Sequence, residues 1–232
     1  MTAIAANLQA VRTRIAAAER ESGSRSSHGA PPVTLLAVSK TWPEAAIREA
    51  SAAGQRAFAE SYVQEGIDKQ SSLQDVPLEW HFVGPVQSNK TRLVAAHFDW
   101  VHSIEREKIA QRLSEQREPS LPPLQVCLQI NVSGEASKSG VSPAAAANLA
   151  RSVSALPRLK LRGLMCIPEA TDDPLLQRHR FAQLRQLLEA LNAELGLNMD
   201  TLSMGMSDDL EAAIAEGATI VRIGTAIFGS RS

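Results

Sequence analysis

The sequence predicts an α/β fold, a single (β/α)8 TIM barrel with an extra N-terminal helix. Short apolar runs rich in branched residues alternate with longer stretches of helical periodicity along the whole chain, and eight such units can be followed. Strands that alternate with helices imply right-handed βαβ units and a parallel sheet. Eight units favour a closed barrel over an open doubly wound sheet, which more often has fewer strands.

The elements follow one another without a break in this rhythm. The first helix is expected over residues 3–21, and residues 22–32 are polar and punctuated by Gly and Pro, which is typical of a loop. The eight expected strands are 34–39, 57–59, 79–83, 98–101, 124–130, 161–165, 200–203 and 219–223. The helices between them are expected near 43–54, 61–73, 88–96, 105–116, 143–154, 174–195 and 207–216. Residues 1–232 are therefore expected to form one domain, in which 1–32 are the N-terminal helix and its loop.

Composition excludes several classes of function. The 24 Lys and Arg residues balance 25 Asp and Glu residues, and this near-neutral charge argues against a nucleic-acid or membrane-surface binder. The two cysteines, Cys127 and Cys166, lack the spacing of a zinc site, and the five histidines show no metal-ligand spacing. No apolar run reaches the roughly 18 residues of a membrane span, and the N-terminus has no signal-peptide core. A cytoplasmic protein without a nucleic-acid, membrane or metal partner is expected.

Lysine is scarce, and the position of each lysine in the predicted barrel separates one from the rest. Reactive groups in parallel barrels lie at the C-terminal ends of the strands. Lysines 69, 90 and 108 fall in polar helical stretches, lysine 160 precedes its strand, and lysine 138 lies in the loop after the fifth strand. Only Lys40 ends a strand, in TLLAVSK.

Lys40 is a candidate Schiff-base lysine. The alternation of the first strand places Leu36, Val38 and Lys40 on one face, so the amine would have apolar neighbours. Such surroundings lower the pKa of a lysine and favour the free amine, which condenses with carbonyl compounds. Position alone leaves the alternative open that Lys40 is a surface lysine at a strand end.

Polar residues after the last two strands are candidates for a phosphate site. Ser203 ends the seventh strand, and Ser207 is expected to cap the following helix. Gly224 and Thr225 follow the eighth strand, and Thr225 is expected to open a short helical turn. Barrels frequently bind phosphate with these two loops and the start of a short extra helix, although ordinary turns would have the same residues.

Two polar residues fall inside expected strands. Arg222 lies in the otherwise apolar eighth strand, where burial requires a partner, either a carboxylate in the core or the ring of a bound aromatic cofactor. His81 lies in the third strand and is expected to be a hydrogen-bonded core residue rather than a ligand or a base.

Taken together, several segments of this chain resemble the YggS/PROSC family of pyridoxal 5'-phosphate homeostasis proteins, whose fold is similar to the N-terminal barrel domain of alanine racemase. The resembling blocks are LLAVSKTWP, FAESYVQEG, EWHFVGPVQSNK, QINVSGEASKSGV, RGLMCIPE, LSMGMSDDLEAAIAEG and VRIGTAIFG. They run in order through nearly the whole chain, which makes the resemblance far more specific than one short motif.

The resemblance implies a set of cofactor contacts. Lys40 would hold pyridoxal 5'-phosphate as a Schiff base, and Arg222 would approach the ring nitrogen and keep it unprotonated, which weakens the cofactor as an electron sink. The residues implied around the phosphate are Ser203, Ser207, Gly224 and Thr225. The family's FGENYVQE is FAESYVQE here, so Ser61 stands where the family has asparagine. The shorter serine is expected to reach the cofactor only through water.

Three functions stay open at this point. The first is a carrier that binds pyridoxal phosphate and passes it to apo-enzymes, without catalytic turnover and as a monomer. The second is a racemase-like enzyme, which needs an acid or base on each face of its intermediate. Alanine racemases take a tyrosine from a C-terminal domain for one face. This sequence ends soon after the eighth strand, and Tyr62 is its one tyrosine. The third is a cofactor-free aldolase that binds a sugar phosphate at Lys40. The carrier is the favoured hypothesis.

Overall fold

The computed structural model describes residues 2–23, 31–135 and 138–230 of the chain. Eight parallel strands form one closed barrel in sequence order, and the last strand pairs with the first. The strands are β1 (Thr34–Val38), β2 (Ala57–Glu60), β3 (Glu79–Phe82), β4 (Trp100–Ile104), β5 (Leu124–Gln129), β6 (Leu159–Met165), β7 (Thr201–Ser203) and β8 (Ile220–Ile223). The predicted barrel is confirmed.

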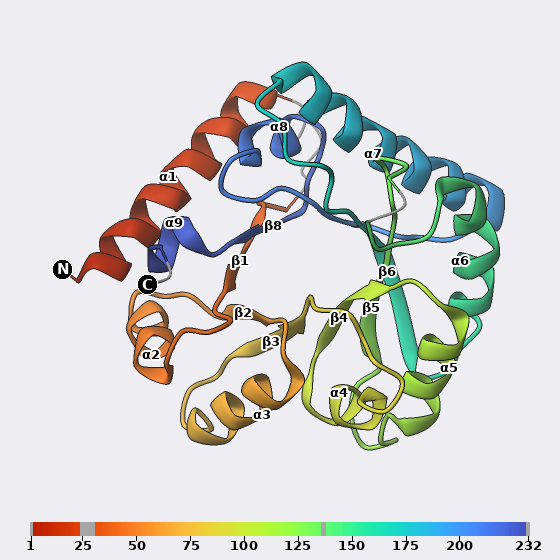
Figure 1. Cartoon of the computed structure of the whole chain (residues 1–232), viewed down its shortest axis with the longest axis horizontal. Helices are drawn as coiled ribbons and strands as arrows, with labels where there is room; N and C mark the ends of the chain where they lie inside the picture. The colour runs from red at the N-terminus through yellow and green to blue at the C-terminus, as the bar shows by residue number, and fades with distance from the viewer. Residues whose placement is uncertain (1, 24–30, 136–137, 231–232) are drawn as a thin grey trace.

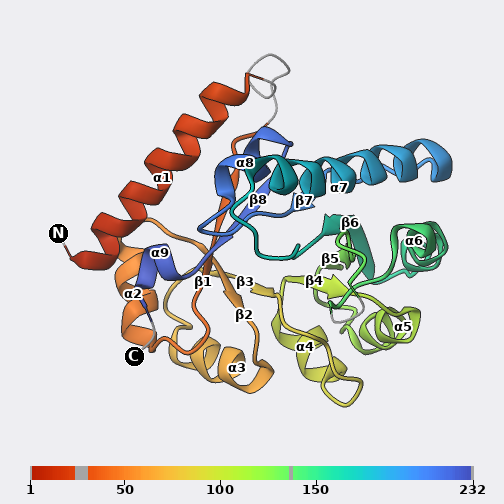
Figure 2. The same cartoon turned by 45° about the horizontal axis from the view of Figure 1, so that its top comes forward.

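The helices lie outside the ring of strands (Figure 1). They are α1 (Ala3–Ser22), α2 (Glu44–Ala52), α3 (Val63–Ser72), α4 (Thr91–His97), α5 (Glu107–Gln116), α6 (Ala146–Ser154), which follows a 3-10 turn at Pro143–Ala145, α7 (Pro174–Leu195), α8 (Leu210–Ala215) and α9 (Thr225–Phe228). The predicted extra helix is α1, and Figures 1 and 2 both place it beside α9. None of the helices in the described ranges is long and apolar enough to cross a membrane.

Helix α1 begins and ends with local signals. The Thr2 hydroxyl accepts a hydrogen bond from the N–H of Ala5, and the helix ends at Gly23 with a left-handed φ of 58°. Its buried side chains Leu8, Val11 and Ile15 belong to the same core cluster as the outward faces of the strands. Residues 24–30, within the loop expected at 22–32, lie outside the described residues.

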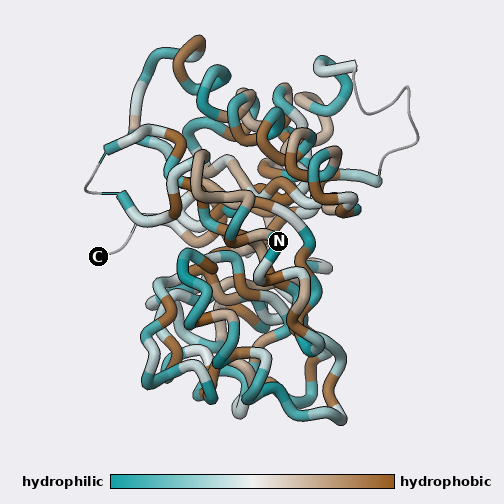
Figure 3. The backbone as a smooth tube through the Cα atoms, turned by 90° about the vertical axis from the view of Figure 1, so that its right-hand side faces the viewer, coloured by the Kyte–Doolittle hydropathy of each residue, from teal (hydrophilic) through white to brown (hydrophobic). Residues whose placement is uncertain are grey.

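The two faces of each strand pack into different cores, because successive side chains of a strand point in opposite directions. Outward residues such as Phe58 and Val221 join the main core between the strands and the helices. Inward residues form two small clusters inside the barrel, one around Leu36 and Ala59 and one around Trp100. Figure 3 shows the hydropathy along the backbone, with brown (hydrophobic) and teal (hydrophilic) segments following one another along the tube.

Several expected boundaries differ from the structure, and three of the differences change the place of a residue discussed above. Strand β4 begins at Trp100 instead of residue 98, because the N–H of Phe98 still bonds to Val94 O of α4 and the Asp99 carboxylate accepts from the N–H of Trp80. Strand β6 begins at Leu159, so Lys160 lies inside it. Helix α8 begins at Leu210 and makes no side-chain cap hydrogen bond, so Ser207 is not its N-cap.

We predict that Gly163→Ala destabilises the barrel by about 1–3 kcal/mol or more. A Cβ at Gly163 would overlap the carbonyl oxygen of Thr201 on the paired strand β7, and backbone on both sides cannot move without loss of sheet hydrogen bonds. Urea denaturation measures the change.

Gly196→Ala is the matched control for this prediction. The added carbon would meet nothing within 4 Å, but φ is 64°, so only the conformational cost of roughly 1 kcal/mol applies. Equal losses in the two variants would contradict the close approach of β6 and β7.

Candidate functional site

A cavity of about 560 Å³ opens at the C-terminal ends of the strands, where reactive groups of parallel barrels lie. Six of the seven residues predicted from the sequence line it: Lys40, Ser61, Ser207, Arg222, Gly224 and Thr225. The seventh, Ser203, is fully buried, and its hydroxyl bonds to Arg222 and His102. The structure thus brings six predicted residues to one cavity and places Ser203 behind Arg222.

Three cationic side chains, Arg14, Lys40 and Arg222, line the cavity against one carboxylate among the described residues, Asp208. The apolar part of the wall includes Val38 and Val83, which pack on the apolar cluster inside the barrel. The excess of basic over acidic groups and the apolar patch together suit an anionic ligand with a flat, weakly polar body.

Lys40 lies two residues after the end of β1, and its neighbour Thr41 has an unusual backbone. Thr41 has a φ of 68°, which is the one left-handed value among the described non-glycine residues. Such a conformation costs on the order of 1–3 kcal/mol and persists only where the surroundings hold it. The N–H of Thr41 donates to Glu65 Oε1 at 2.5 Å, so a side chain of α3 holds the segment that carries Lys40.

A buried cluster of Lys69, Glu60 and Glu65 fixes the backbone on both sides of Lys40. The ammonium of Lys69, which is 5% exposed, donates to Glu60 Oε1 at 2.8 Å, to Glu65 Oε1 at 2.6 Å and to the carbonyl of Ser39 at 2.8 Å. The Ser39 hydroxyl donates to Glu60 Oε1 at 2.7 Å. The residues on both sides of Lys40 are therefore anchored to one cluster.

Burial dominates the electrostatics of Glu60. Its carboxylate is fully buried, which raises its pKa, and the hydrogen bond from Lys69 opposes that rise. Sequence reasoning missed this cluster, because Lys69 was assigned to a polar helical stretch. The available signals were the spacing of Glu65 and Lys69 by four residues and the carboxylate at the end of β2.

Arg222 crosses from β8 toward β7 and β6. Its Nη1 donates to Ser203 O at 2.6 Å and to Ser203 Oγ at 2.8 Å, and its Nη2 donates to Cys166 O at 2.8 Å. No carboxylate lies within ion-pair distance of it in the described part of the chain, so the core ion pair weighed from the sequence is not formed. All three partners are neutral, and the positive charge of Arg222 stays available at the cavity wall.

The loop that follows β8 also lines the cavity. A Cβ at Gly224 would lie 3.3 Å from the carbonyl oxygen of Val38, so a larger residue would press on β1. Helix α9 starts at Thr225, as predicted, and the N–H groups of Ile227 and Phe228 donate to the carbonyl of Gly224. The carbonyl of Ser207 accepts from Arg14 Nη2 at 3.1 Å, which fixes the neighbouring loop against α1. Two hydroxyl residues, Ser207 and Thr225, thus line the cavity from two adjacent loops.

These groups fit pyridoxal 5'-phosphate. The cofactor has an aldehyde for a primary amine, a phosphate for N–H and hydroxyl donors, and an aromatic ring with an acceptor nitrogen. Lys40, the loops at Ser207 and Thr225, and the donor-only guanidinium of Arg222 supply the complementary groups around one cavity.

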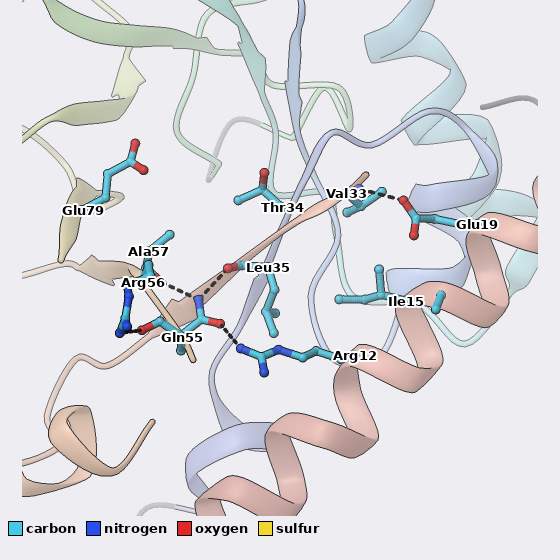
Figure 4. Close-up of a pocket in the computed structure, with 11 residues that line it drawn as sticks. Arg12, Ile15, Glu19, Val33, Thr34, Leu35, Gln55, Arg56, Ala57 and Glu79 are labelled. Atoms are coloured by element: carbon cyan, nitrogen blue, oxygen red, sulfur yellow. Dashed lines mark hydrogen bonds between the residues drawn. The ribbon is translucent and has the colours of Figure 1, made fainter. Parts of the chain in front are cut away.

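A second cavity of about 430 Å³ lies near the N-terminal ends of β1 to β3 (Figure 4). Its arginines are already bonded: Arg12 donates to Ala53 O and Gln55 Oε1, and Arg56 donates to Ser51. No lysine is among the described residues that line it. This cavity therefore lacks the Schiff-base group, although Glu79 at its edge becomes relevant below.

The fold and the cavity at the C-terminal ends of the strands define a barrel of the alanine racemase N-terminal type. The model of the family described as "Alanine racemase, N-terminal domain" matches residues 1–232. The chain is 60% identical over 231 residues to the pyridoxal phosphate homeostasis protein of Pseudomonas aeruginosa, covering 100% of this chain and 97% of that protein. It is 53% identical over 234 residues to the protein of the same name from Escherichia coli (strain K12), covering 100% and 98%. The chain belongs to the family of pyridoxal phosphate homeostasis proteins.

Solved structures agree with this assignment. PipY of Synechococcus elongatus, solved with PLP bound, superposes with a TM-score of 0.84 at 39% identity, covering 97% of this chain and 100% of that one. Alanine racemase of Corynebacterium glutamicum has a TM-score of 0.70 at 20% identity, covering 99% of this chain and 60% of that one. The likeness to the racemase shows the fold alone.

We predict that Lys69→Met lowers the free energy of unfolding by about 3–5 kcal/mol, because it leaves buried carboxylates without their cation. The amide of Thr41 should also exchange its hydrogen faster, since Glu65 loses the group that holds it. Urea denaturation and hydrogen exchange measure the two effects.

Two variants control this prediction. Lys108→Met removes an exposed lysine from α5 and should change neither quantity. Glu65→Gln keeps an oxygen acceptor for Thr41 and should slow the exchange relative to Lys69→Met. Unchanged Thr41 exchange in Lys69→Met would show that the cluster does not hold the Lys40 segment.

A second prediction concerns pH. His102 is fully buried between His81 and Ser203, and burial, followed by the charges of His81 and Arg222, holds its pKa well below the ordinary range. Below about pH 6.5 the imidazole of His102 takes up a proton in the unfolded chain but not in the folded chain. The free energy of unfolding therefore decreases as the pH is lowered, by about 1.4 kcal/mol per pH unit until the folded pKa is reached. His102→Asn cannot titrate, and urea denaturation should therefore show its stability rising relative to the unaltered protein as the pH falls. A pH-independent difference would contradict the shift.

Proposed function

We propose that this protein binds pyridoxal 5'-phosphate in the cavity at the C-terminal ends of the strands and serves the homeostasis of the cofactor without catalytic turnover. The observation that carries the proposal is the convergence of the Lys40 amine, the Arg222 guanidinium and the two donor loops on one cavity. The relatives at 53–60% identity are named for the homeostasis of this cofactor, which supports the same function here.

Each residue has a separate task in this proposal. Bound pyridoxal phosphate supplies an aldehyde carbon that condenses with a primary amine, and Lys40 provides that amine. Ser207, Gly224 and Thr225 surround the phosphate, and Arg222 donates to the ring nitrogen, which remains unprotonated. Ser61 contributes a hydroxyl at the wall, where the related proteins' motif has an amide. Ser203 acts from behind by holding Arg222.

A carrier is favoured over a racemase-like enzyme. The relatives that share more than half of their residues with this chain bear the homeostasis name, whereas the racemase structures share 13–20% and support the fold alone. Tyr62 is 58% exposed and does not line the cavity. The cavity as described therefore holds one basic amine, Lys40, for a reaction that needs a group on each face.

The proposal extends to partners and location. The partners are pyridoxal phosphate and the apo-enzymes that receive it, and the protein acts as a monomer of one domain. Both cysteines are free and buried, which suits a reducing compartment such as the cytoplasm.

The decisive test is the linkage to Lys40. The purified protein is expected to be yellow after incubation with pyridoxal phosphate, and borohydride should fix the mass of the cofactor on Lys40. Lys40→Ala should lose the colour and the label, because Lys40 is the one lysine among the described residues that line the cavity. Mass spectrometry of the peptide that contains Lys40 measures both results.

Lys138→Ala and Lys108→Ala are the lysine controls, and both should label as the unaltered protein does. A colourless protein that ignores added cofactor would contradict the proposal and favour an aldolase that uses Lys40 alone. The racemase alternative is tested by incubating the loaded protein with single amino acids in deuterated water. Steady exchange of the α-hydrogen would overturn the carrier.

A further inference from the structure

A chain of polar side chains crosses the inside of the barrel behind the cavity. His81 Nδ1 lies 2.8 Å from His102 Nε2, and His102 Nδ1 lies 2.8 Å from Ser203 Oγ. Ser203 Oγ in turn accepts from Arg222 Nη1 at 2.8 Å. These four residues come from β3, β4, β7 and β8 and are at most 5% exposed. Burying four polar side chains costs desolvation free energy unless each is hydrogen-bonded, so we ask what function their alignment serves.

The two ends of this chain differ in chemistry. Arg222, at the cavity end, is a donor only. At the other end, His81 Nε2 makes no hydrogen bond and lies 3.4 Å from Glu79 Oε1, which also accepts from Trp100 Nε1 at 2.6 Å. Trp100 stacks on the His81 ring at a centroid distance of 5.4 Å and fixes its plane. Glu79 lines the cavity at the N-terminal ends of the strands (Figure 4). The series of polar side chains therefore runs through the barrel from that cavity to the one that Arg222 lines.

Donor and acceptor capacity assigns a direction to the whole chain. Because Arg222 donates to Ser203 Oγ, the Ser203 hydroxyl is free to donate to His102 Nδ1. His102 then carries its proton on Nε2 and donates to His81 Nδ1, which places the His81 proton on Nε2, toward the Glu79 carboxylate. Both imidazoles are neutral in this arrangement, in accord with the depressed pKa of His102. A proton on His102 Nδ1 would leave the Ser203 hydroxyl without its acceptor.

We propose that Ser203, His102 and His81 are positioning residues that orient the Arg222 guanidinium toward the ligand in the cavity. The inference rests on the proposed function, because it assigns the ligand-facing role to Arg222. Three of the five guanidinium N–H groups are used by Ser203 O, Ser203 Oγ and Cys166 O, which leaves the others for a ligand acceptor. His102 and His81 hold the hydroxyl of Ser203 in the one orientation that presents its oxygen to Arg222.

The test compares paired variants of the full chain. Ser203→Ala and His102→Leu remove a link, whereas Ser203→Thr keeps the hydroxyl and His102→Asn keeps an acceptor near the position of Nδ1. We expect the first pair to weaken binding of pyridoxal phosphate about tenfold and to shift the absorption maximum of the bound cofactor, because the hydrogen bond from Arg222 to the ring changes. The second pair should stay within about twofold. Cys127 lies inside the same barrel but is not one of these hydrogen-bonded side chains, so Cys127→Ala should leave both the affinity and the absorption maximum unchanged.

A second measurement does not depend on the cofactor. Nitrogen chemical shifts of ¹⁵N-labelled histidine in the ligand-free protein should show both His81 and His102 neutral and protonated at Nε2. Ser203→Ala should alter the His102 signal, and its Arg222 side chain should rotate faster. Thermal unfolding confirms that each variant folds.

The outcomes separate the two proposals. Failure of the unaltered protein to bind pyridoxal phosphate contradicts the proposed function, while the histidine signals still report on the chain. Normal affinity and an unshifted spectrum in both Ser203→Ala and His102→Leu overturn the positioning role. A His102 protonated at Nδ1 in the unaltered protein overturns it as well.

Discussion

The hydrogen bonds between β8 and β1 close the sheet, and the site depends on that closure. They pair Leu36 with Arg222 and Ala37 with Ile223, so the two ends of the chain meet at one seam. Lys40 follows β1 and Gly224 follows β8, and the cavity forms where these loops emerge together. A closed barrel leaves no unpaired edge strand, and its twist tilts the strands so that side chains fill the interior. The geometry of the site is therefore a consequence of the backbone pairing.

Two buried cations lie near this seam, and their hydrogen-bond partners differ in charge. Lys69 bonds to two carboxylates, which neutralise its charge, and the cluster anchors the backbone on both sides of Lys40. Arg222 is held by two carbonyls and a hydroxyl, which satisfy donors without cancelling charge. An anionic cofactor is attracted more strongly by a cation that no carboxylate neutralises. Neutral partners therefore suit an arginine that faces the ligand, and charged partners suit a lysine with a structural role.

The interior of the barrel is divided in the same way. One side is apolar, around Leu36, Ala59 and Ile220, and Val38 and Val83, which pack on it, line the cavity together with Lys40. The other side contains the histidines behind Arg222. Ile167 and Met206 at the cavity wall are each 39% exposed, so the mouth is open on that side. An anchored lysine, an oriented arginine and an open mouth suit a protein that holds a cofactor and releases it.

The sequence alone determined the order of the elements, the closed barrel, Lys40 after the first strand, and Ser207, Arg222, Gly224 and Thr225 of the cavity wall, because periodicity and the end of a strand are local properties. Ser61 was indicated only by the resemblance to the family. It did not determine the role of Ser203, which depends on the neighbour that β7 pairs with, or the buried cluster of Lys69, Glu60 and Glu65, since burial of a helical lysine depends on what packs over it. The histidine chain joins residues of β3, β4 and β7 that approach one another only when the strands are wound into a barrel. Contacts across the barrel arise from its closure and tilt, and no spacing along the chain encodes them.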